Sequence, residues 1–437
     1  MVPSVASSSS ATQPRYVIAN TSLYDVLVHE NFPHIDRHLG ALIALVGVAG
    51  GLVGAAYISA LHALESFLAP EQFGSWHTQL LVLVAVGGVI GLLIKALGDP
   101  GDVELLVDNI HVSGSGNDVR SLRSLLPASL LGIAAGSALG PEAPLVQTAG
   151  TIGALAGRSR ALTTEQMRVL AICGMASAFA VLFGAPLGSA VFALEILHRR
   201  GLEYYEALLP ALGGALIGFA VFIGLEGVGY GPLIDLPAAV DVSTSDLLWG
   251  GVAAVVGSAL ATVFTLLVGA LRRLAVLVPG LLRPAAGGVV LGLLTIWSSA
   301  ALTFGEAQIS VLGMGTWPAS TLAAALVAKL LASAVCLATG WRGGFIIPLF
   351  FVGATAGQLI HIAVPSVDAT VLMAACMVAT NVGVTKTPVG STLVIAKMAG
   401  LQLLPSTTLA AVGAMILTNQ VNLIASQRQR APSTAAA

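Results

Sequence analysis

Charged residues are scarce in this chain. Asp, Glu, Lys and Arg make up 9% of its 437 residues, whereas an ordinary soluble domain contains roughly a quarter. The formal net charge is −2 and there is no basic tract, so nothing in the composition points to nucleic-acid binding. Because 56% of the residues are hydrophobic, the chain is predicted to be a polytopic membrane protein.

Cysteines are few, and the common enzyme motifs are absent. The three cysteines, Cys173, Cys336 and Cys376, all lie in apolar segments, where a free cysteine packs as a small hydrophobic residue. The sequence has no Gly-x-Ser-x-Gly elbow, no His-Glu-x-x-His zinc motif and no P-loop. We therefore expect no disulfide, metal site or cofactor, and no enzymatic activity.

Long apolar runs and glycines are abundant. Each run is long enough to cross a bilayer, at about 20 residues per span, while the 50 glycines predict close helix packing and broken helices. The runs are 41–60, 80–97, 208–225, 249–271 and 321–337.

The second half of the chain echoes the first. Cys173 and Pro186 recur, in similar surroundings, as Cys376 and Pro388, which lie 203 and 202 residues further on. Paired Gly/Pro-interrupted segments in corresponding halves are typical of inverted repeats with a substrate site near the bilayer midplane. The predicted fold is therefore all-α, a polytopic membrane protein built as an inverted-topology internal repeat of short, tilted and broken helices.

This repeat predicts four regions. Residues 1–40 are a polar N-terminal segment with a cytoplasmic helix, and they lack the charged start and apolar core of a signal peptide. The two half-repeats cover residues 41–225 and 226–425. Residues 426–437 are a short polar tail, which leaves no room for an appended regulatory domain.

Glu142 is the leading candidate for a functional residue. It lies between Pro141 and Pro144 in an apolar region, where an ionisable side chain is costly and usually functional. Proline in the first turn and an acid at the positive dipole end both indicate a helix start. Free N–H groups there could hold an anion, so the carboxylate and an anion would compete, as in a gate. The simpler alternative is an acid that only stabilises the first turn.

Four motifs, in order, resemble a known family. Residues 140–144 are similar to Gly-Arg-Glu-Gly-Pro, residues 343–348 to Gly-Gly-x-Phe-x-Pro, and residues 184–187 and 386–389 to the paired helix starts that follow these motifs. From about residue 41 to 423 the chain resembles a CLC-type chloride channel or chloride/proton antiporter, of a divergent bacterial type.

The resemblance implies a homodimer in the cell (plasma) membrane, with one chloride path per subunit and roughly eighteen short, tilted helices. It implies that Glu142 is the gate. The anion-binding residues would come from both half-repeats: Gly140, Pro141, Ala143, Pro144, Gly344, Phe345, Ile346, Ile347 and Pro348.

The outer and inner anion sites depart from the family pattern. Pro141 replaces the usual arginine, which implies weaker outer binding. The inner motif Gly-Ser-Gly-Ile-Pro is matched only by residues 98–102, so Asp99 and Asp102, beside Gly101, would repel chloride at low dielectric. Either these acids face an aqueous mouth or the permeant ion differs.

The proton route also departs from the family pattern. Ile196 occupies the place of the proton-relay glutamate, and no tyrosine follows Tyr230, so that Asn419 or Asn422 would have to replace the central tyrosine. These features favour channel-like or weakly proton-coupled transport. Chloride/proton antiport stays open, as does an inverted-repeat carrier for an organic anion, and the ion could be chloride, nitrate, bicarbonate or fluoride.

Overall fold

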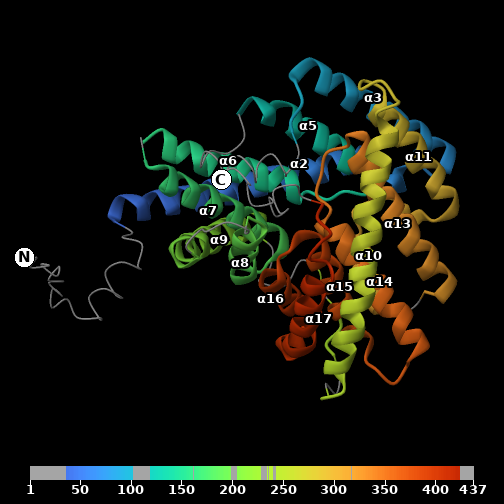
Figure 1. The fold of residues 1–437 in the computed structure, drawn as a ribbon. Coiled ribbons are helices and arrows are strands. Elements are labelled where there is room, and N and C mark those ends of the chain that lie inside the picture. The colour runs from blue at the N-terminus through green and yellow to red at the C-terminus, as the bar shows by residue number, and fades with distance from the viewer. Residues whose placement is uncertain are drawn as a thin grey trace, which may run out of the picture. The chain divides into compact units, whose positions relative to one another are not determined.

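The computed structural model describes residues 36–101, 119–160, 162–197, 204–227, 234, 236–239, 243–315 and 317–423. Contacts divide the chain after His34, and all of these residues belong to the second unit. Within these ranges the fold is all-helical, with fifteen α-helices and no strand (Figure 1). This confirms the predicted fold class.

The first half contains the helices up to residue 226. They are α2 (Arg37–Leu68), α3 (Trp76–Leu97), α5 (Val119–Ala134), α6 (Glu142–Arg158), α7 (Thr164–Phe183), α8 (Pro186–Ile196) and α9 (Tyr204–Glu226). The short 3₁₀ helix η1 (Pro70–Gln72) joins α2 to α3.

The second half begins at residue 246. Its α-helices are α10 (Asp246–Ala275), α11 (Arg283–Trp297), α12 (Glu306–Gly313), α13 (Ala319–Thr339), α14 (Ile346–Ala363), α15 (Ala369–Thr385), α16 (Pro388–Ala399) and α17 (Leu404–Leu417). The 3₁₀ helices η2 (Ser299–Ala301) and η3 (Leu401–Leu403) lie between them.

Seven of the described helices are long and apolar enough to cross a membrane. Five of them, α2, α3, α9, α10 and α13, contain the five apolar runs of the sequence. The other two, α7 and α14, have lower mean hydropathy because small and polar residues interrupt them. The chain is therefore an integral membrane protein.

The internal repeat is visible in how the helices pair. Helix α6 packs on α7 in the first half, and α14 packs on α15 in the second. Between the halves, α8 packs against α16 (Figure 1). Gly188 of α8 abuts Val394 of α16, while Gly390 of α16 abuts Phe192 of α8. Each partner in one contact lies 202 residues from its counterpart in the other, as a pseudo-two-fold axis requires.

A cluster of aromatic rings fills the space between the halves. The ring centroids of Phe179 and Phe192 are 4.9 Å apart, and those of Phe183 and Phe350 are 6.2 Å apart. All four side chains are buried, and such tilted pairs add to the stabilisation from burial alone. This packing fixes α14 of the second half against α7 and α8 of the first.

Candidate functional site

The two Gly/Pro-rich helix starts meet at one point in the bundle. The N–H of Gly140 donates to the carbonyl of Gly344 over 2.8 Å, and the N–H of Gly344 donates back over 2.6 Å. This antiparallel bridge joins equivalent positions of the repeat. Helix α6 begins at Glu142 and α14 at Ile346, so the N-terminal ends of both helices converge on the same place.

Glu142 occupies the space between these helix starts. Its side chain is 1% exposed, and its Oε1 accepts the N–H of Ile347 over 2.6 Å. Its Oε2 is buried without a hydrogen-bond partner among the described residues. A carboxylate here takes the position that a helix N-terminus offers to an anion, because the first N–H groups are unpaired and lie at the positive dipole end.

Both bridging glycines are required by this carboxylate. A Cβ built on Gly140 or on Gly344 would collide with Glu142 Oε2. Neither glycine has a positive φ, so the limit is space and not backbone conformation.

The predicted anion-binding residues surround this point, and all are buried: Gly140, Pro141, Ala143, Pro144, Gly344, Phe345, Ile346, Ile347 and Pro348. The family resemblance implies that the N–H groups of Glu142, Ala143, Phe345 and Ile346 hold the anion. In the structure the N–H that meets the carboxylate belongs to Ile347, one residue further into α14.

An acidic cavity of about 630 Å³ opens beside the gate candidate. Pro141 and Ile347 form part of its lining. Four carboxylate residues also line it, together with His62: Glu65, Glu71, Glu226 and Glu306. Sequence reasoning missed this group because each acid stands alone near a different helix end, so that no motif connects them.

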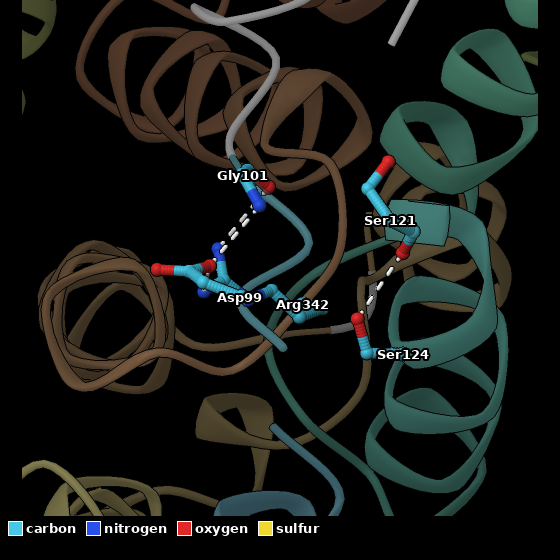
Figure 2. A network of polar contacts seen from close by, with 5 residues as sticks. All are labelled: Asp99, Gly101, Ser121, Ser124 and Arg342. Carbon is cyan, nitrogen blue, oxygen red and sulfur yellow. Dashed lines mark hydrogen bonds and ion pairs between the residues drawn. The ribbon is translucent and has the colours of Figure 1, made fainter. Parts of the chain in front are cut away.

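Asp99 follows the C-terminal end of α3 and forms an ion pair. Its Oδ1 lies 2.8 Å from Arg342 Nη2 (Figure 2), and it also accepts the N–H of Gly101 over 3.0 Å. Arg342 Nη1 donates to the carbonyl of Gly101. The Asp99 side chain is 73% exposed and has Arg342 as its counter-charge. Asp102 lies outside the described residues.

The structure separates the inner-mouth residues into two cavities. Asn419 and Asn422 line one of about 680 Å³ with Arg272 and Arg273. Asp99 lines another of about 590 Å³, and only Arg272 is common to the described linings of both. The two asparagines and Asp99 therefore do not share one cavity.

Ile196 is buried at the end of α8. The residue before it, Glu195, binds the start of another helix. Glu195 accepts the N–H groups of Val389 over 3.0 Å and Gly390 over 2.7 Å. Both donors lie in the first turn of α16, so Glu195 caps a helix of the other half-repeat. Sequence reasoning did not predict this contact, although Pro186 and Pro388 mark the two segments as equivalent in the repeat.

A metal centre is not supported in the part of the chain that the structure describes. No group of three or more His, Cys, Asp or Glu residues there is arranged to hold a metal ion. The arrangement at Glu142 instead suits a small anion held by backbone N–H groups.

Comparisons with known proteins agree with this geometry. The family model described as voltage gated chloride channel matches residues 102–419. A chloride/fluoride channel protein of Pseudomonas syringae pv. tomato is 26% identical and is aligned over 91% of this chain and 87% of its own length. Among solved structures, a CLC-type fluoride/proton antiporter is similar in fold, with a TM-score of 0.78, 22% identity, and coverage of 90% of this chain and 98% of that one.

A slow cyanobacterial Cl−/H+ antiporter has the same fold, with a TM-score of 0.75 and 21% identity. The alignment covers 87% of this chain and 95% of that one.

Proposed function

The chain belongs to the voltage-gated chloride channel family, and from this premise we propose that it carries chloride across the cell membrane along a path gated by Glu142. The family expectation of a homodimer with one path per subunit is part of the proposal.

The observation that carries the proposal is the Ile347 N–H bound to Glu142 Oε1 at 2.6 Å. The N-termini of α6 and α14 provide N–H donors and positive dipole ends. They meet where Gly140 of the first half pairs with Gly344 of the second, which is the only isolated bridge among the described residues. The carboxylate fills that place in this conformation. A permeating anion replaces it when Glu142 swings away or takes up a proton.

The transport mode is channel-like or weakly proton-coupled. Ile196 cannot relay a proton, and the neighbouring Glu195 is bound to the start of α16. Two of the solved structures of similar fold are described as antiporters, so chloride/proton antiport is the second candidate. Fluoride is the second candidate ion, because the Pseudomonas relative is described as a chloride/fluoride channel.

Anion efflux from proteoliposomes tests the gate. Vesicles loaded with potassium chloride and made permeable to potassium with valinomycin should release chloride when wild-type protein is present. Glu142→Gln should release it at an equal or higher rate and lose most of its pH sensitivity, because the side chain can no longer ionise.

Glu195→Gln is the matched control, since it neutralises another carboxylate that also binds a helix N-terminus. Its flux should keep the wild-type pH dependence. Unchanged flux and pH response in Glu142→Gln would reduce Glu142 to a helix cap, and absence of chloride release from wild type would overturn the proposed function.

Proton movement separates channel from antiporter. In vesicles made permeable to potassium with valinomycin, an outward chloride gradient should drive chloride efflux with little proton uptake, as followed with an internal pH indicator. Proton uptake in fixed proportion to chloride would establish antiport instead. Uptake of an organic anion that is insensitive to chloride would favour the third alternative, an organic-anion carrier.

A further inference from the structure

Basic side chains gather in the 590 Å³ cavity at one end of the bundle. Among its described lining residues, Lys95, Arg272, Arg283 and Arg342 are cationic and Asp99 is the one carboxylate. The C-terminal ends of α3, α10 and α13 border the cavity, together with the start of α11. Because α3, α10 and α13 are candidate spans, the cavity lies at a membrane face and not at the midplane.

Two of the guanidinium groups are held in place. Arg342 is fixed by Asp99 over 2.8 Å and by the carbonyl of Gly101 over 3.3 Å (Figure 2). Arg283 Nε donates to the carbonyl of Val278 over 2.9 Å. A planar guanidinium that is already oriented binds a phosphate with less loss of side-chain freedom, and phosphate is a preferred partner of arginine.

Helix ends explain part of this charge but not all of it. Lys95 and Arg272 lie in the last turns of α3 and α10, where cations offset the negative dipole end. Arg283 starts α11, so its charge adds to a positive dipole end. Among the described lining residues, four cations lie against one carboxylate, so this part of the lining carries a positive charge.

Exposed apolar side chains lie within two residues, along the chain, of residues that line this cavity. Leu277 is 82% exposed and Leu282 54% exposed in the connection between α10 and α11, and Leu97 at the end of α3 is 45% exposed. A water-soluble ligand would gain nothing from these exposed apolar side chains. Acyl chains would lie against them while a headgroup occupied the basic cavity.

We propose that this cavity binds the phosphate group of an anionic phospholipid. Phosphate is the recognised chemistry, and the exposed apolar side chains assign it to a lipid headgroup in preference to free phosphate. Basic pockets between membrane helices at a membrane face are suited to such headgroups. The site includes Asp99, a predicted inner-mouth residue, but not the predicted gate Glu142, and its occupancy can be measured without any transport assay.

Lipid retention tests the site. Wild type and variants are reconstituted in an equal mixture of phosphatidylcholine and phosphatidylglycerol and re-extracted in detergent, and the bound lipids are quantified by mass spectrometry. Wild type should retain phosphatidylglycerol selectively. Lys95→Gln removes an exposed charge with little risk to the fold, and retention should weaken roughly fivefold for each cation removed, and further in Lys95→Gln/Arg272→Gln.

Arg273→Gln is the matched control, because Arg273 neighbours Arg272 but lines the other cavity; its retention should equal that of wild type. Thermal unfolding in detergent then separates the two phosphate sources. Short-chain phosphatidylglycerol should raise the unfolding midpoint of wild type more than inorganic phosphate does. Equal retention in all variants, or an equal shift with inorganic phosphate, would overturn the assignment.

Discussion

At the scale of single residues, Gly140 and the Glu142 carboxylate compete for the same space. The nearest atoms to a Cβ on Gly140 all belong to the Glu142 carboxyl group. Gly140→Ala should therefore destabilise the wild-type protein but be tolerated in Glu142→Ala. We expect a coupling energy of about 1 to 3 kcal/mol in this double-mutant cycle. It is obtained from the unfolding free energies of the four proteins. Where unfolding is irreversible, the ranking of their thermal midpoints shows whether the loss of the carboxylate relieves Gly140→Ala.

The control for this cycle is Gly140→Ala in Glu142→Gln, where the side chain keeps its size. That pair should show little relief. If Gly140→Ala is equally costly in all three backgrounds, the carboxylate does not rest against Gly140 in solution.

The ion pair between Asp99 and Arg342 should matter more to flux than to stability. Asp99 is largely exposed, and exposed pairs contribute at most about 1 kcal/mol. Asp99→Asn should leave the thermal midpoint nearly unchanged and increase chloride efflux, because it removes a negative charge at the predicted inner mouth. Arg342→Gln should decrease efflux. A lower efflux in Asp99→Asn would show that the acid does not act through its charge.

At the scale of helices, Glu195 of α8 is tied to the start of α16. Glu195→Ala leaves the N–H groups of Val389 and Gly390 without this acceptor. We expect a loss of about 1 kcal/mol, since an acid at a helix N-terminus contributes roughly this much. Glu195→Gln retains an acceptor oxygen and should lose less. Thermal midpoints of the two variants test this order, and equal midpoints for both variants and wild type would contradict it.

Sequence patterns identified the helix starts but not what lies between them. Pro186 and Pro388 were enough to predict that the starts of α8 and α16 are equivalent, because proline acts through local backbone geometry. The cap formed by Glu195 was not predictable, because it depends on packing between α8 and α16. The acidic cavity escaped prediction for the same reason, since Glu71 and Glu306 become neighbours only in the tertiary structure.

At the scale of the whole molecule, fixed charges of opposite sign lie at the two ends of α3. The α3 residue Gln79 donates to the carbonyl of Pro70, which lines the acidic cavity, while Lys95 lines the basic cavity. A helix of 22 residues separates these ends by about 30 Å. The described linings of the two cavities near the ends of α3 therefore carry charge of opposite sign.

We expect anion entry past the acidic cavity to depend on pH through Glu306, which begins α12 outside the candidate spans. Burial raises the pKa of Glu306, and the nearby carboxylate of Glu65 raises it further. Because a raised pKa keeps an acid protonated to higher pH, mild acidification on this side removes its charge and should increase anion flux.

Glu306→Gln should show higher flux at neutral pH, roughly fivefold for about 1 kcal/mol of lost repulsion, and a weaker response to acid. The pH dependence that remains in Glu306→Gln should disappear only when Glu142→Gln is added. Planar-bilayer currents with pH changed on one side at a time measure this, and a wild-type pH response in Glu306→Gln would show that the acidic cavity does not control entry.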